Sequence, residues 1–304
     1  MTAVSESLPE TAFGRAAATH PLRWDEKGFV FEIQSADADV LKIARRIFAV
    51  QTMTVSGEAS RSWRIERSSI ADAEGWIVSA SSRTSSMIPV RADNRDAAIL
   101  HVEYDALDWM INNTPGSIVV HAALLSRNDR GVMIVGPSLA GKSTLATALW
   151  RDGWSLLSDD LVFIDAHNIA SPAPRRVSLR KESKDLVGNS LWNTISETPS
   201  CVETQKGLFF HPHEVSGSVK QRQTKLSAIF FLARRESNVG SAESRPLNQA
   251  KAALALVPYA FNVRAQPFMD ALKRVTPLIE HVPAFDLGRG DLSAMVGEVE
   301  SNAG

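Results

Sequence analysis

The chain has 304 residues, of which 44% are hydrophobic and 22% are charged, the composition of an ordinary globular protein of one or two domains. Its 33 Lys and Arg residues balance 34 Asp and Glu residues, so a net charge of −1 excludes a global attraction to nucleic acid or anionic membranes. The single cysteine, Cys201, excludes an internal disulfide framework and any metal site built from several cysteines.

The N-terminal segment, residues 1–20, lacks both the basic start and the apolar run of a secretory signal peptide. No later segment contains the roughly 18 uninterrupted apolar residues that a membrane-spanning helix needs. Together with the cysteine content, these features predict a cytoplasmic protein with no membrane and no nucleic-acid partner.

The first third of the sequence has the patterns of a small α/β domain. Alternating apolar and polar residues predict three short strands, at residues 29–33, 63–67 and 76–80. Apolar residues at helical spacing predict two helices, at residues 37–50 behind Asp37 or Asp39 as caps, and at residues 94–112. We therefore expect a small N-terminal α/β domain over residues 1–114, which contains no motif that indicates chemistry.

The pattern changes in residues 115–304, which we expect to form a second, larger domain. Apolar runs predict buried strands, and apolar residues at helical spacing predict helices. The expected strands lie at residues 118–125, 131–135, 156–164 and 226–233. The expected helices run from about Lys142 to Gly153 and over residues 247–261, 267–279 and 291–299. Residues 171–185 are polar and basic, which favours either a phosphate or peptide contact or a solvated loop.

A glycine-rich loop connects the strand at residues 131–135 to the helix that follows it. The loop matches G-x-x-x-x-G-K-[ST], the pattern of the phosphate-binding P-loop (Walker A motif), in the strand-before, helix-after setting that phosphate binding requires. Its residues are Gly136, Pro137, Ser138, Leu139, Ala140, Gly141, Lys142, Ser143 and Thr144. The sequence therefore predicts that the phosphates of ATP, or of another nucleoside triphosphate, bind here.

Each residue type in this loop has a physical reason. Glycines let successive N–H groups converge on phosphate oxygens, and the N-terminus of the next helix adds a positive end of roughly half a charge. Lys142 supplies a compact cation for the β- and γ-phosphates, and the Ser143 hydroxyl is a ligand for Mg²⁺. Leu139 is unusual, because a glycine is expected at the centre of such a loop.

Two adjacent carboxylates, Asp159 and Asp160, interrupt the apolar strand at residues 156–164. Burying two unpaired charges is costly, whereas Mg²⁺ and a substrate hydroxyl would use both of them. The alternative is an exposed turn or a helix cap. His121, in the apolar run before the loop, is open to two interpretations as well, a hydrogen-bonded core residue or a catalytic one.

The order and spacing of these groups resemble the catalytic domain of HPr kinase/phosphorylase. In that family a histidine precedes the loop, and an R-G-H-x-L-x-A-D-D-like segment follows it. Here Gly136 follows His121 by 15 residues and Asp159 follows Lys142 by 17, and both spacings are similar to those of the family. The resemblance implies a PEP-carboxykinase-like P-loop kinase domain in residues 115–304, and it extends most clearly over residues 117–163.

The resemblance also implies a role for each matched residue. Asp159 would accept the proton of an attacking serine hydroxyl, and Asp160 would hold Mg²⁺ together with Ser143. His121 would orient Asp159 or the γ-phosphate. Arg175, in the basic stretch, would clamp the transferred phosphoryl group or an acidic peptide, because a guanidinium group matches such oxygens.

After the acidic pair the chain departs from HPr kinase itself, since the E-x-R-G-L-G signature of that family is absent. In its place residues 172–181 read PAPRRVSLRK, which resembles the P-x-P-R-P-I-S-L-K stretch of HPr-kinase-related proteins. Those relatives occur beside peptide-modifying gene systems, so the implied substrate is a peptide or protein serine, such as a precursor peptide, rather than HPr. The hexamers of HPr kinases imply a homo-oligomer.

Three functions follow as hypotheses. The first is an ATP-dependent serine kinase of a peptide or protein. The second is a kinase of a free small molecule such as serine. The third is a nucleotide-binding regulator without transferase activity, which Leu139 favours.

Overall fold

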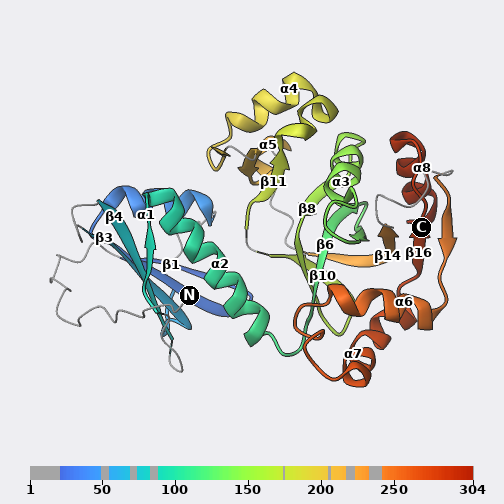
Figure 1. Cartoon of the computed structure of the whole chain (residues 1–304), viewed down its shortest axis with the longest axis horizontal. Coiled ribbons are helices and arrows are strands. Elements are labelled where there is room, and N and C mark those ends of the chain that lie inside the picture. The colour runs from blue at the N-terminus through green and yellow to red at the C-terminus, as the bar shows by residue number, and fades with distance from the viewer. Residues whose placement is uncertain are drawn as a thin grey trace, which may run out of the picture. The chain divides into compact units, whose positions relative to one another are not determined.

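The computed structural model describes residues 21–48, 55–68, 74–82, 88–173, 175–204, 207–216, 223–232 and 242–303 (Figure 1). The chain divides into two compact units, Met1–Tyr104 and Asp105–Gly304. Their boundary falls inside helix α2 (Arg95–Asn113), upstream of residue 114, where the sequence pattern changes. The expectations for residues 1–20 and for Pro174 fall outside the described residues.

The N-terminal unit is a five-stranded sheet with helices, and the three strands that the alternating pattern predicts are β2, β3 and β4 of this sheet. Its strands lie side by side in sequence order, and all neighbours are antiparallel except β2 and β3, which are parallel. The strands are β1 (Leu22–Glu26), β2 (Phe29–Gln34), β3 (Arg61–Ser68), β4 (Gly75–Ser81) and β5 (Val90–Ala92). In its aromatic core, Phe31 on β2 and Trp63 on the neighbouring β3 are buried, with ring centroids 5.6 Å apart.

Helix α1 (Ala38–Ile47) connects the two parallel strands. Asp37 caps it, because its carboxylate accepts hydrogen bonds from the backbone N–H groups of Asp39 and Val40 at 2.9 and 3.3 Å. Asp37, and not Asp39, is therefore the cap among the two that the sequence suggests. The apolar face of the helix, with Val40 and Ala44, is fully buried.

The C-terminal unit contains a mixed eight-stranded sheet. The order is β10-β9-β6-β7-β14-β16-β15, with β8 also paired to β6. These strands are β6 (Ile118–Arg127), β7 (Arg130–Val135), β8 (Ser155–Ser158), β9 (Leu161–Ile164), β10 (Ile169–Pro172), β14 (Thr224–Leu232), β15 (Ser244–Pro246) and β16 (Ala284–Leu287). Because β7, β14 and β16 are parallel, their carboxyl ends meet at one edge of the sheet.

Helices cover both faces of this sheet, which makes three layers (Figure 1). Along β7, Met133 and Val135 pack on one face and Val132 and Ile134 on the other, the two-residue period of a strand. The first face is covered by α6 (Gln249–Leu256) and α7 (Phe268–His281), and the second by α3 (Lys142–Arg151) and α8 (Leu292–Asn302). The α/β class expected from the sequence is confirmed.

Two expectations for this unit need correction. The strand expected at residues 156–164 is two strands, β8 and β9, separated by the two carboxylates. The helix expected at residues 247–261 ends at Leu256 and continues as a short 3-10 turn that contains Pro258, because proline has no N–H to continue an α-helix.

The basic stretch at residues 171–185 is not a solvated loop. It includes β11 (Val177–Arg180), in which Val177 and Leu179 are buried and alternate with Ser178 and Arg180. This strand belongs to a small second sheet that packs against helix α4, with its own apolar core. The other elements here are β12 (Val202–Thr204), β13 (Gly207–Phe210), α4 (Lys184–Ser196) and α5 (Pro212–Ser216).

Gly207 lets β13 approach β11 closely. Its φ is 142°, and a Cβ atom there would lie 2.0 Å from the carbonyl oxygen of Leu179. Any side chain at this position would therefore push β11 away from its partner.

Across the described part of the chain, none of the helices combines the length and the apolar character needed to cross a bilayer.

Candidate functional site

Strand register places the three sequence-predicted groups beside one another. On one side of β6, Ala122 pairs with Val135, the last residue before the glycine-rich loop. On the other side His121 pairs with Leu161, and the Ala122 N–H donates to the Asp160 carbonyl at 3.0 Å. The start of β6 thus lies between the loop and the acidic pair, so segments that are distant in sequence meet at this edge.

The backbone of the loop has positive φ angles at two positions, one a glycine and one Leu139. Gly141 caps α3 with a φ of 97°, and Leu139 has a φ of 65°. A Cβ atom on Gly136 would lie 2.9 Å from the carbonyl oxygen of Leu232 at the end of β14. Leu139 therefore occupies a left-handed conformation that suits glycine, with its side chain 68% exposed.

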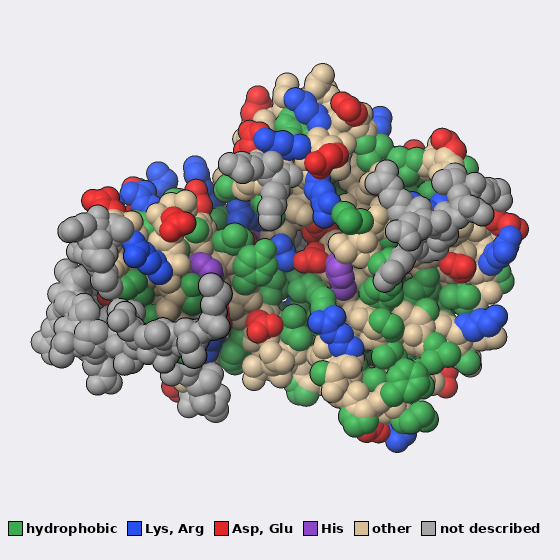
Figure 2. Space-filling model, in the orientation of Figure 1, with side chains coloured by type: hydrophobic (Ala, Val, Ile, Leu, Met, Phe, Trp, Pro, Cys, Tyr) green, Lys and Arg blue, Asp and Glu red, His purple; other side chains and the backbone are tan. Residues whose placement is uncertain are grey.

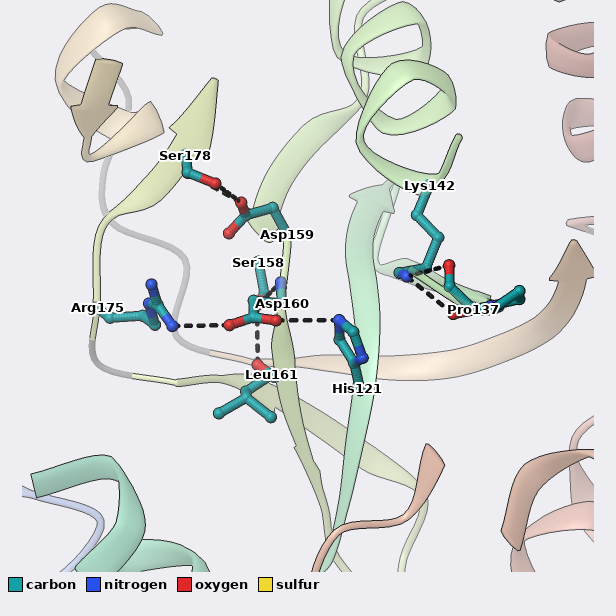
Figure 3. Close-up of polar contacts among 10 residues, drawn as sticks. His121, Pro137, Lys142, Ser158, Asp159, Asp160, Leu161, Arg175 and Ser178 are labelled. Carbon is teal, nitrogen blue, oxygen red and sulfur yellow. Dashed lines mark hydrogen bonds and ion pairs between the residues drawn. The ribbon is translucent and has the colours of Figure 1, made fainter. Parts of the chain in front are cut away.

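Lys142, at the start of α3, is nearly buried and lies over the loop. Its Nζ donates to the carbonyl oxygens of Gly136 and Pro137, at 2.8 and 3.1 Å (Figure 3). Burial lowers the pKa of this ammonium group, and the carboxylates of Asp160 and Asp159 oppose that effect. The lysine is thus held against the first two residues of the loop.

Asp160 lies between two donors (Figure 3). His121 Nε2 is 3.1 Å from Asp160 Oδ1, and an Arg175 guanidinium nitrogen donates to Oδ2 at 2.7 Å. Burial acts to raise the pKa of Asp160, but the hydrogen bond from His121 and the charge of Arg175 outweigh it, so the pKa lies below its ordinary value. The structure therefore pairs His121 with Asp160, and not with Asp159 as one implied role had it.

Asp159 has a different environment from its neighbour. Its Oδ2 accepts hydrogen bonds from the Ser178 backbone N–H at 2.9 Å and from the Ser178 hydroxyl at 2.7 Å, which leaves Oδ1 as the oxygen that Ser178 does not use. Burial raises the pKa of this carboxyl above its ordinary value, and Ser178 only partly offsets the effect. The two adjacent carboxylates thus have pKa values shifted in opposite directions.

A cavity of about 800 Å³ joins these groups, within the range of ligand pockets, roughly 300–1,000 Å³. In Figure 2 side chains of both charges and a histidine gather over the positions of β6 and β8. The sequence-predicted residues that line the cavity are Ser138 to Thr144, His121, Asp159 and Asp160. Three predicted residues do not line the cavity but bind side chains that do. Arg175 donates to Asp160, and the carbonyl oxygens of Gly136 and Pro137 accept hydrogen bonds from Lys142.

These residues fit a nucleoside triphosphate with Mg²⁺. The close approach of Gly136 to β14 and the left-handed Gly141 shape the backbone as a phosphate cradle needs. Within the described ranges, no group of three or more His, Cys, Asp or Glu side chains is arranged to hold a metal by itself. Mg²⁺ is usually held by one or two carboxylates together with the phosphates of the substrate. Ser143 and Asp160 both line the cavity, where Ser143 offers a hydroxyl oxygen and Asp160 a carboxylate.

Sequence reasoning missed Ser178 and Arg289, and within the basic stretch it favoured Arg175 over Arg180. Ser178 and Arg180 lie on β11, where the alternation of V-S-L-R was the available signal. Arg289 also lines the cavity, from the loop between β16 and α8. Its position in Gly288-Arg289-Gly290, before the helix cap Asp291, was the signal there.

Comparisons with known proteins give only distant structural likenesses. No protein-family model matches the chain, and no curated protein matches it. Among solved structures it is similar to the Hpr(Ser) kinase/phosphatase from Coxiella burnetii, with 16% sequence identity and a TM-score of 0.34, over 60% of this chain and 88% of that one. At that TM-score the likeness establishes neither fold nor function, so the chemistry of this chain is inferred from its own site.

Proposed function

We propose that the protein is an ATP-dependent kinase that transfers the γ-phosphoryl group to a serine hydroxyl of a peptide or protein. The observation that supports this most is that one and the same cavity is lined by the loop lysine, Lys142, and by two carboxylates, Asp159 and Asp160, with opposite pKa shifts. Pairs of titratable groups with pKa values pushed apart are typical of acid-base sites. In this proposal residues 115–304 form a PEP-carboxykinase-like P-loop domain.

The loop and α3 bind the phosphates in this mechanism. Backbone N–H groups of the loop and the N-terminus of α3 face the phosphate oxygens, and Lys142 neutralises the β- and γ-phosphate charge in place of its contacts with Gly136 and Pro137. When bound, Mg²⁺ would supply positive charge that screens the phosphates. Ser143 and Asp160 are the residues that would hold it.

Asp159 serves as the general base. Its raised pKa makes it a stronger base than an ordinary carboxylate, and Oδ1 is the oxygen that would accept the proton of the serine hydroxyl. As the hydroxyl oxygen bonds to the γ-phosphorus, the bond to the β-phosphate oxygen breaks and ADP leaves. The contacts of His121 and Arg175 hold Asp160 in the position that this geometry needs.

The peptide or protein acceptor is supported by the site's surroundings and by the sequence resemblance. Arg180 lines the cavity and is exposed, so a basic group lies where an acidic peptide or a transferred phosphoryl group would pass. A precursor peptide and a homo-oligomer remain part of the proposal through the resemblance to HPr-kinase-related proteins.

One observation favours a second function, a nucleotide-binding regulator without transferase activity. Leu139 holds a left-handed conformation at the centre of the loop, a strained state for a leucine. Strain in the cradle would let the loop hold nucleotide without the geometry that transfer demands.

Incubation of the purified protein with γ-labelled ATP and Mg²⁺ tests both functions. Candidate acceptors are serine-containing peptides, with free serine in a parallel reaction. Label on a peptide serine supports the proposal, and label on free serine replaces it with a small-molecule kinase. Tight ATP binding without transfer to either acceptor would make the protein a regulator. Lys142→Ala, which removes the loop ammonium group, is the negative control for any label.

A further inference from the structure

The cavity has two chemically different ends on either side of the loop. At one end lie His121, Asp159 and Asp160, the groups assigned above to transfer. At the other end, the residues on the cavity wall are Arg289, Gly290, Leu292 and Met295. Apolar side chains and one arginine therefore stand opposite the carboxylates.

Strand order explains why this second end borders the loop. The loop follows β7, β14 is its parallel neighbour, and β16 is the next parallel strand. Arg289 comes two residues after the end of β16, at the same edge of the sheet, and the helix α8 follows it. In open α/β sheets, ligands bind in the crevice at the carboxyl ends of such strands.

Arg289 is fixed against the loop itself. Its guanidinium group donates a hydrogen bond to the carbonyl oxygen of Ala140. A Cβ atom on Gly141 would lie 3.0 Å from the same guanidinium group, so the glycine provides the space that the arginine uses. The arginine is thus positioned by the residues that also cradle phosphate.

The side chains around Arg289 suit a flat, partly apolar ligand. Leu292 and Met295 pack with the core beneath α8 and present their remaining surface to the cavity. The Arg289 Nε is buried and has no hydrogen-bond partner among the described residues, so one donor of the group remains unused. A planar guanidinium group stacks on aromatic rings, which an ammonium group does not do.

We propose that this end of the cavity is the nucleoside subsite, where the base of the nucleotide lies between the Arg289 guanidinium plane and the apolar wall of Leu292 and Met295. The bound nucleotide then runs across the loop, with its γ-phosphate towards Asp159. This subsite rests on one part of the proposed function, the binding of a nucleotide to the loop. It does not depend on the transfer step.

Calorimetry on the full chain tests the subsite with two ligands, Mg-ATP and Mg-tripolyphosphate, which lacks a base and a ribose. Arg289→Lys keeps the positive charge and a donor for the Ala140 carbonyl but loses the flat face. We expect it to bind ATP about tenfold more weakly, equivalent to ~1.4 kcal/mol, with tripolyphosphate binding unchanged. Arg245→Lys is the matched control, because Arg245 is exposed on β15, where it pairs with Glu243, and does not line the cavity.

Three results would overturn the subsite. If Arg289→Lys weakened the binding of both ligands equally, Arg289 would contact the phosphates and not the base. If ATP binding were unchanged, Arg289 would not contact the nucleotide. Wild-type protein that binds tripolyphosphate as tightly as ATP would show that the nucleoside contributes nothing. Failure of the kinase proposal is separate, because a protein that binds ATP through Arg289 but transfers no phosphate retains the subsite.

Discussion

Asp159 and Asp160 are adjacent in sequence, yet their side chains have different partners. Ser178 holds Asp159 through two hydrogen bonds to one oxygen, whereas His121 and Arg175 engage both oxygens of Asp160. Asp160 is thereby kept ionised, and Asp159 is a stronger base than usual. These contacts therefore suit the two carboxylates to different roles, Asp160 to carrying a negative charge and Asp159 to accepting a proton.

The first prediction concerns Asp159. Asp159→Asn keeps the shape and the hydrogen-bonding capacity towards Ser178 but cannot accept a proton. We expect ATP affinity to persist while the transfer rate falls by about 10²–10⁴-fold, the usual contribution of a general base. Calorimetry and single-turnover transfer to a serine peptide measure the two quantities. Near-normal turnover would remove Asp159 from the base role.

A second prediction concerns the strain at Leu139. Leu139→Gly removes the Cβ atom that makes a φ of 65° unfavourable, so the loop should reach the phosphate-binding conformation more easily. We expect a higher ATP affinity, measured by calorimetry. Leu139→Ala is the control, because alanine keeps the Cβ atom and removes only the exposed part of the side chain. A gain of equal size in both variants would contradict an effect of backbone strain.

At the scale of single residues, the sequence predicted those site residues that belong to a short motif. Lys142, Ser143 and the acidic pair follow from local patterns and spacing. Arg289 could not be found in this way, because its relation to the loop depends on the sheet order that brings β16 beside β14. The partner of His121 likewise depends on strand register, which spacing alone does not determine.

Among the helices and strands, those whose apolar residues recur with one clear period were predictable from the sequence. Helix α1 and strand β7 have the apolar spacing and the caps or flanking glycines that identify them. Strand β11 was missed because two of its four residues, Ser178 and Arg180, are polar, and its buried positions are only Val177 and Leu179. Short strands of this kind are determined by their partners, here β13, more than by their own composition.

The third prediction belongs to the scale of a helix. Asp37→Ala removes the carboxylate that caps α1, so the free energy of unfolding of this helix should fall by about 1 kcal/mol, within the range ~0.5–2 kcal/mol measured for such caps. Hydrogen exchange at the α1 amides measures the change. Asp39→Ala is the control, since only the backbone N–H of Asp39 takes part in the cap. Equal effects from the two variants would contradict the assignment.

At the scale of the whole chain, every residue that lines the cavity lies in the unit Asp105–Gly304. We therefore predict that a fragment of residues 94–304, which keeps α2 intact, binds ATP with the affinity of the full chain. Titration of both proteins with a fluorescent ATP analogue provides the comparison. If the fragment is folded by circular dichroism but binds more weakly, the N-terminal unit contributes to the site.

The tight packing at Gly207 affects how mutations in this protein should be interpreted. Gly207 lines no part of the described cavity, but any side chain there would displace β11 at Leu179, next to the serine that holds Asp159. A saturation screen for loss of transfer should therefore recover nearly every substitution of Gly207 together with those of the loop lysine. Such positions would be mistaken for ligand contacts in a mutational map. The ATP affinity of the Gly207 variants would distinguish them from variants of the loop lysine.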